Sequence, residues 1–248
     1  MTESAFEHYL PSISGNGGLI FLCDHAANAL PAGYGTLGLE DAAFATHIAY
    51  DIGAADVCRA LAAAYGAPAV LARYSRLLID LNRGPDDPTL VMKLSDGRIV
   101  PGNRNVAAEE VEIAAARDEG RVPVLISLHS FTPVWKGCPR PWQVGVLWDR
   151  DDRLARPLMM ELEKAGVVVG DNEPYSGALE NDCLWRHGTM NGLPHVLIEI
   201  RQDLLATMDA ARGFALRLKP ILDAALVRMG PAEIRFARPA CAEKDSQL

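Results

Sequence analysis

Two apolar runs in this chain each lead to a histidine, and this pairing is the feature that most constrains the fold. The runs are GGLIFLCDHAAN at residues 17–28 and VPVLISLHS at residues 122–130. Because Val, Ile and Leu follow one another without polar alternation, both runs predict buried strands of a sheet that is covered on both faces. Ligand sites in such sheets lie just outside the carboxyl ends of the strands. We therefore expect His25 and His129 to converge there as two ligands of a metal site, which favours a metal-dependent hydrolase.

The rest of the chain alternates strand patterns with helix patterns. We expect further strands at 68–72, 143–148, 167–169 and 194–200, a small hairpin at SDGR, and helices at about 40–64, 109–119, 153–165 and 204–227. This alternation predicts an α/β fold with a mainly parallel or mixed central sheet and helices on both faces. No repeat or linker divides the 248 residues, so we expect a single domain over 1–248, with its core at about 18–229 and a loose tail at 231–248.

Charge and cysteine content limit the partners and the compartment. A formal net charge of -8 opposes general binding to nucleic acid, which requires a basic face. It permits a small anionic substrate, because a few arginines in a pocket outweigh a distant acidic surface. The five cysteines are odd in number and form no CxxC pair, and the chain shows neither a signal-peptide pattern nor a membrane-spanning run. We therefore expect a cytoplasmic protein that binds no membrane.

A catalytic zinc ion usually has three protein ligands, so a third group should join the two histidines. Asp51 is one candidate, either as a ligand or as the carboxylate that orients a ligating histidine. It follows His47 by four residues in the expected helix, so the two would share a face, and the alternative is a solvated helix surface. Asp24 and Asn28 compete with Asp51, although an extended strand would direct Asp24 away from His25.

The segment ARYSRLLIDLNRG carries arginines that an apolar strand does not need for packing. The planar guanidinium group of arginine matches a carboxylate, so Arg76 and Arg83, assisted by Asn82, are candidates to hold a substrate carboxylate. The alternative is an ion-paired surface with Asp80 and Asp86 as the partners.

Two later segments add candidates for catalysis and substrate binding. HVLIEIRQDL places Glu199 near the end of a buried strand, where it is a candidate general base for metal-assisted hydrolysis. The alternative is a structural ion pair between Glu199 and Arg201. The polar loop GDNEPYSG brings Asn172 and Tyr175 to the expected mouth of the pocket.

Six motifs in order, CDHAAN, HIAYDIGA, YSRLLIDLNR, LHSFTP, GDNEPYSG and HVLIEIRQDL, resemble the N-formylglutamate amidohydrolase family over residues 19–205. The resemblance implies a zinc-exopeptidase-like (phosphorylase/hydrolase-like) fold with one zinc ion per chain. It also implies hydrolysis of an N-acyl amino acid, foremost N-formyl-L-glutamate to formate and L-glutamate, a late step of one route of histidine catabolism.

The wider fold group binds zinc through an HxxE motif and a later histidine, positions that His25 and His129 match. Asn28 stands where that motif has its glutamate, which strengthens the case for Asp51 as the third ligand. Asn82 and Arg83 match the pair that holds the substrate carboxylate, and Glu199 matches the general base. The alternatives are a peptidase or amidase that uses the same metal centre on a larger substrate, and a non-catalytic binding protein that has lost the metal.

Overall fold

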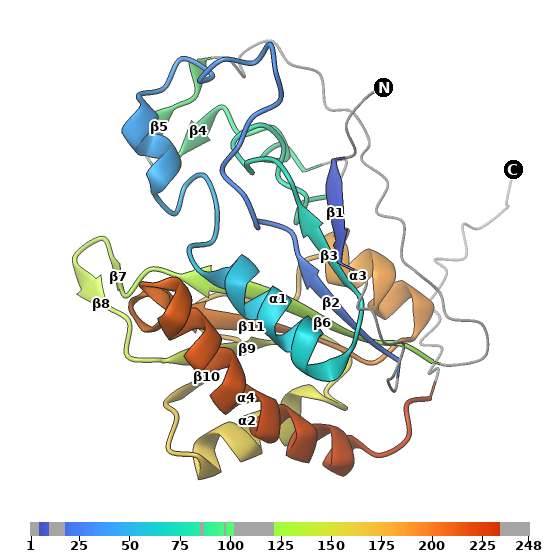
Figure 1. Cartoon of the computed structure of the whole chain (residues 1–248). Helices are drawn as coiled ribbons and strands as arrows, with labels where there is room; N and C mark the ends of the chain where they lie inside the picture. Colours follow the sequence, from blue (N-terminus) through green and yellow to red (C-terminus); the bar gives the residue numbers. More distant parts are fainter. Residues whose placement is uncertain (1–4, 10–17, 85–86, 97, 102–121, 234–248) are drawn as a thin grey trace, which may run out of the picture.

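A seven-stranded sheet crosses the centre of the molecule (Figure 1), and the computed structural model describes residues 5–9, 18–84, 87–96, 98–101 and 122–233. The strand order is β1-β3-β2-β6-β11-β9-β10. The sheet strands are β1 (Phe6–Tyr9), β2 (Leu19–Cys23), β3 (Ala69–Ala72), β6 (Val124–Phe131), β9 (Val144–Leu147), β10 (Val169–Asp171) and β11 (His195–Arg201). Two small hairpins pair β4 (Leu94–Ser95) with β5 (Arg98–Ile99) and β7 (Val134–Trp135) with β8 (Cys138–Pro139).

The four central strands, β3, β2, β6 and β11, are parallel, and the edges are mixed. β1 is antiparallel to β3, and β9 is antiparallel to β11 and parallel to β10. All residues of β2, β3 and β6 are buried, as the apolar runs predicted. The prediction of a single α/β sheet of mixed type is confirmed.

Helices cover both faces of the sheet, as predicted. The α-helices are α1 (Ala54–Tyr65), α2 (Ala155–Lys164), α3 (Cys183–His187) and α4 (Met208–Met229), and the 3₁₀ helices are η1 (Asp41–Ala45), η3 (Thr189–Asn191) and η4 (Gln202–Leu205). α1, α2 and α4 share one apolar core with the side chains of one sheet face, such as Phe21, Ile126 and Ile198. α3 packs on the opposite face, against Leu22, Leu125 and Leu197 (Figure 1).

The helix expected at about 40–64 is in fact two helices, which corrects the prediction that His47 and Asp51 share a helix face. η1 ends at Ala45, α1 begins only at Ala54, and Gly53 caps α1 with a φ of 77°. Between the two helices, the backbone N–H of Asp51 donates a hydrogen bond to the carbonyl oxygen of His25 at 3.0 Å. The connection therefore brings Asp51 against the end of β2.

Other boundaries differ from expectation by a few residues. β10 begins at Val169, two residues later than predicted, and the run ending at His129 continues to Phe131. β1, α3 and the β7–β8 hairpin were not predicted, whereas the SDGR hairpin is present as β4 and β5. The helix predicted at 109–119 and residues 234–248 of the predicted tail lie outside the described residues. No helix in the described part of the chain is long and apolar enough to cross a membrane.

Candidate active site

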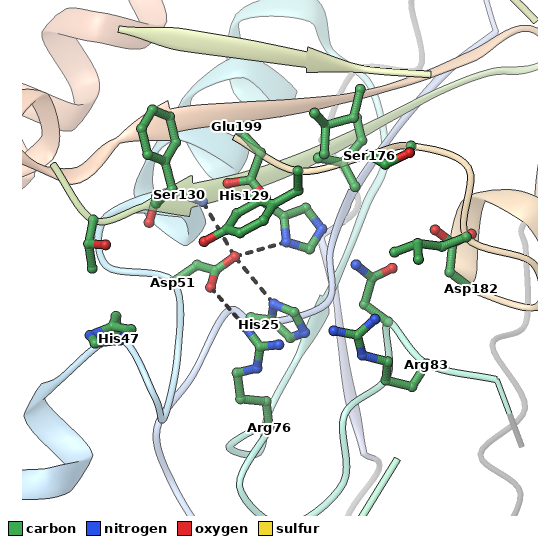
Figure 2. A pocket seen from close by; sticks show the side chains of 18 of the residues that line it. His25, His47, Asp51, Arg76, Arg83, His129, Ser130, Ser176, Asp182 and Glu199 are labelled. Atoms are coloured by element: carbon green, nitrogen blue, oxygen red, sulfur yellow. Dashed lines mark hydrogen bonds and ion pairs between the residues drawn. The ribbon is translucent and has the colours of Figure 1, made fainter. Parts of the chain in front are cut away.

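A pocket of about 380 Å³ opens at the carboxyl ends of the parallel strands (Figure 2). This volume lies within the range of about 300–1,000 Å³ that is usual for small-molecule sites. Its lining consists of His25, His47, Asp51, Arg76, Asn82, Arg83, His129, Ser130, Phe131, Thr132, Leu147, Tyr175, Ser176, Gly177, Leu179, Asp182, Leu197, Glu199 and Gln202. All but one of the predicted site residues are therefore brought together.

His25, Asp51 and His129 meet at the floor of this pocket. Oδ2 of Asp51 lies 2.8 Å from Nδ1 of His129 and 3.3 Å from Nδ1 of His25. One ligand atom from each of the three residues lies within 4.8 Å of the others, and all three side chains are buried (Figure 2). Two imidazole nitrogens and a carboxylate oxygen form a donor set that suits zinc.

The outer nitrogens of both imidazoles are held by other side chains. Nε2 of His25 donates to Oδ1 of Asp80 at 2.6 Å, and Nε2 of His129 lies 3.1 Å from Oγ of Ser127. A ligating histidine usually has its second nitrogen bound in this way, which fixes the ring and its tautomer. Both Nδ1 atoms are thereby directed at one point, so the residues fit a metal ion on these nitrogens and Asp51.

The ionisation of these groups follows from their contacts. Burial alone would raise the pKa of Asp51, but the charges and hydrogen bonds of His25 and His129 outweigh it and hold that pKa well below its ordinary value. Burial alone would lower the pKa of both histidines, but nearby carboxylates outweigh burial, so each pKa is raised overall. These carboxylates are Asp80 and Asp51 for His25, and Asp24 and Asp51 for His129. The floor of the pocket is thus a site at which positive charge is stabilised.

Glu199 lies beside this cluster because β11 pairs with β6 in a register that sets it opposite His129. Its side chain is buried, and its Oε2 accepts no hydrogen bond within the described chain. Burial raises the pKa of Glu199 to about 7. The alternative ion pair with Arg201 does not form, since the guanidinium group of Arg201 binds Asp203 at 2.7 Å and three backbone carbonyls.

The two predicted arginines differ in how far they are already engaged. Nη2 of Arg76 donates to Oδ2 of Asp80 at 2.6 Å, and its Nη1 lies 3.6 Å from Oδ1 of Asp51. Arg83 approaches Asp80 only to 3.9 Å, and its side chain is 31% exposed. Arg83 and Asn82 therefore line the pocket with donor groups that a substrate can reach, whereas Arg76 mainly braces the floor.

Three residues considered in the sequence do not join the cluster at the floor, although one of them lies directly behind it. Oδ1 of Asn172 accepts from the backbone N–H groups of Trp148 and Gly177, and the residue does not line the pocket, so its predicted contact with substrate is not supported. Asn28 is exposed and donates to Phe44 O. Asp24 is buried behind His129, with 3.7 Å between its Oδ2 and Nε2 of the histidine.

Two acidic residues of the site were not recognised from the sequence. Asp80 had been considered only as a surface ion-pair partner, yet it is fully buried and binds His25 and Arg76. Its place within the apolar stretch LLIDLN was the available signal, since a carboxylate there is buried only when it is paired. Asp182 carried no signal, because it lies between a loop and a short helix.

The comparisons with known proteins identify the family of the chain. The model of the N-formylglutamate amidohydrolase family matches residues 17–112 and 106–206. The chain belongs to the N-formylglutamate amidohydrolase family. No curated protein matches the chain in sequence. The family places this chain among hydrolases of amide bonds.

Two solved structures share the fold of this family member. The gene product Atu2144 from Agrobacterium tumefaciens is 30% identical, with a TM-score of 0.80, over 91% of this chain and 96% of that one. N-formylglutamate amidohydrolase from Ralstonia eutropha JMP134 is 20% identical, with a TM-score of 0.52, over 90% of this chain and 96% of that one. The second likeness shows the fold alone.

Proposed function

We propose that this amidohydrolase is zinc-dependent and cleaves small N-acyl amino acids. The family name puts N-formyl-L-glutamate first among the substrates to test, with formate and L-glutamate as products. The single observation that carries the proposal is the convergence of His25, Asp51 and His129 at the floor of a small pocket, next to the buried Glu199.

His25 and His129 would hold the metal through Nδ1, and Asp51 would hold it through a carboxylate oxygen. A bound zinc ion supplies Lewis acidity, which lowers the pKa of water and polarises a carbonyl group. Asp80 and Ser127 keep the two rings oriented by binding their Nε2 atoms. One zinc ion per chain is expected.

Glu199 is the proposed general base. With a pKa of about 7 it can take a proton from the attacking water and deliver it to the nitrogen of the leaving amine. Arg83 and Asn82 bind the carboxylate of the substrate, which holds the amide over the floor of the pocket. Tyr175, 44% exposed, lies at the mouth, where it can cover a bound substrate.

Steady-state release of formate from N-formyl amino acids by zinc-loaded protein, together with metal analysis, tests this function. Wild type should contain close to one zinc ion per chain, and His129→Ala should lose both metal and activity while its circular dichroism stays native. Glu199→Gln should retain zinc and KM but lower kcat by about 10²–10⁴-fold. Arg83→Ala should raise KM by about 10²-fold.

Other results would support other functions. Full activity of Glu199→Gln would remove Glu199 as the base. Zinc binding without turnover of any N-acyl amino acid would favour a peptidase or amidase with a larger substrate. Absence of zinc binding would favour a binding protein that has lost the metal.

A cytoplasmic location also stays a proposal, supported by the absence of disulfides among the four described cysteines.

A further inference from the structure

The arginines near the pocket differ in how far carboxylates of the protein already bind them, and this affects which amino acid the pocket accepts. Arg76 is engaged by Asp80 and Asp51. Arg140 contacts Tyr175 but does not line the pocket. In the described part of the lining, Arg83 is thus the arginine more available to a substrate carboxylate, and a second carboxylate would compete with Asp80 and Asp51 for Arg76.

Asp182 introduces a negative group on the same side of the pocket as Arg83. Figure 2 shows Arg83 and Asp182 on one side and His47 on the other, with Asp51 and His25 between them. Asp182 is buried, with 5% of the residue exposed. Within the described residues no Lys, Arg or His comes within 4.0 Å of its carboxylate, and the charges of His129 and Arg83 act on it only from farther away.

The carboxylate of Asp182 is only partly used by the fold. Its Oδ1 accepts a hydrogen bond from Trp185 N at 2.6 Å and so caps the start of α3. Among the described residues this is the one hydrogen bond that its carboxylate accepts, and the pocket lining that contains Asp182 also contains Leu147, Leu179 and Leu197. We call Asp182 and these three leucines the wall, a mainly apolar part of the lining with one carboxylate oxygen that the fold leaves unbonded.

We propose that this wall selects an N-acyl amino acid with one carboxylate and a side chain that ends in a hydrogen-bond donor, an amide or an ammonium group, and that it disfavours an acidic side chain. The inference rests on the proposed function, since it places the α-carboxylate on Arg83 and the scissile amide at His25, Asp51 and His129. The side chain then extends along the three leucines, and its terminal donor binds Oδ2 of Asp182. A terminal carboxylate would instead face Asp182, and like charges in contact oppose binding.

The test compares Nα-formyl-L-glutamine and Nα-formyl-L-lysine with N-formyl-L-glutamate on zinc-loaded enzyme at pH 8. Glutamine and glutamate differ by one terminal group of the same shape, so their kcat/KM ratio isolates the charge. Wild type should favour the glutamine and lysine derivatives by about tenfold or more. Asp182→Asn, which keeps an N-cap acceptor for Trp185 N, should bring the ratio of glutamine to glutamate close to one, mainly by improving the glutamate derivative.

Asp171→Asn is the matched control, because it removes a carboxylate that accepts from a tryptophan N–H but does not line the pocket. It should leave the ratio unchanged. A wild type that prefers N-formyl-L-glutamate, or a ratio that Asp182→Asn does not move, would overturn the inference while leaving the hydrolase function intact. Failure to hydrolyse any of the three compounds would count against the proposed function itself. If Asp182→Asn does not fold, the wild-type ratio of kcat/KM for the glutamine and glutamate derivatives tests the inference by itself.

Discussion

At the scale of single residues, the site depends on carboxylates whose roles differ although their chemistry is the same. Asp51 faces the two Nδ1 atoms, Asp80 holds the far side of one ring, and Glu199 is buried without a hydrogen bond to its Oε2 from the described chain. Surroundings alone separate them, since the histidines lower the pKa of Asp51 and burial raises that of Glu199 to about 7. One carboxylate is thereby kept charged and another is able to exchange a proton near neutral pH.

The identity of the third metal ligand gives the first prediction. Asp51→Ala should lower zinc affinity far more than Asn28→Ala, because Asp51 contacts both histidines whereas Asn28 is exposed and bonded to Phe44 O. Asp80→Asn should have an intermediate effect of about 10–100-fold, since it only orients His25. Competition with a chelating dye measures all three. The reverse order for Asp51 and Asn28 would contradict the proposed ligand set.

Asp182 gives a prediction for stability against pH. Burial raises the pKa of Asp182 to about 6, from an ordinary 3.8. A raised pKa means that the folded protein binds this proton more tightly than the unfolded chain does. The proton therefore contributes its full stabilisation of the fold below about pH 4, and that contribution is lost as the pH rises through 6. Relative to Asp182→Asn, wild type should therefore lose roughly 1 kcal/mol of unfolding free energy between pH 5 and pH 8. Urea titrations of both proteins at the two pH values measure it, and a difference that stays constant would show that burial does not raise this pKa.

At the scale of elements, the start of α1 fixes where Asp51 lies. Gly53 adopts a φ of 77°, and a Cβ added there would lie 2.5 Å from Cβ of Leu205 in η4. The backbone at Gly53 therefore packs closely against the segment after β11, and this contact positions the loop that carries Asp51. A long helix, expected from the alanine-rich pattern, would have placed Asp51 on a different surface.

Gly53→Ala should therefore affect both stability and the site. We expect a loss of about 2 kcal/mol or more in unfolding free energy, from a strained backbone and a clash with Leu205, together with weaker zinc binding. Gly137→Ala is the control, because Gly137 has a φ of 79° but open space around its Cβ. It should cost about 1 kcal/mol and leave zinc binding unchanged. Equal effects of the two variants on zinc affinity would contradict the link between Gly53 and Asp51.

The sequence predicts an element well when neighbouring residues determine it, and poorly when contacts with distant residues determine it. The buried runs of β2, β3 and β6 were predictable, because a strand covered on both faces must be apolar throughout. The break between η1 and α1 was not, because a tertiary contact with Leu205 and a bond to His25 O cause it. The same holds for the site: His25 and His129 follow from the strand ends, whereas Asp80 and Asp182 reach the pocket through loop paths that no local pattern specifies.

At the scale of the whole molecule, the proposed metal would connect the end of β2, the loop before α1 and the carboxyl-terminal part of β6. A ligand that binds only the folded state stabilises it by about 4 kcal/mol at a thousandfold excess over Kd. Removal of zinc by a chelator should therefore lower the melting temperature of wild type by several degrees. His129→Ala should melt at the same temperature with and without chelator. A melting temperature of wild type that the chelator does not change would indicate that no structural link of this kind exists.

The same arrangement has a consequence for the order in which the molecule assembles. The residues that meet at Asp51 are separated from it by 26 positions for His25 and by 78 for His129. No single helix or hairpin of the described structure contains two of the three groups, so the full set of ligands forms only when β2, the loop before α1 and β6 have come together. Contacts this distant along a chain form slowly, after local helices have appeared. Metal uptake during refolding would therefore follow the recovery of helical signal and mark the moment at which β2 and β6 have paired.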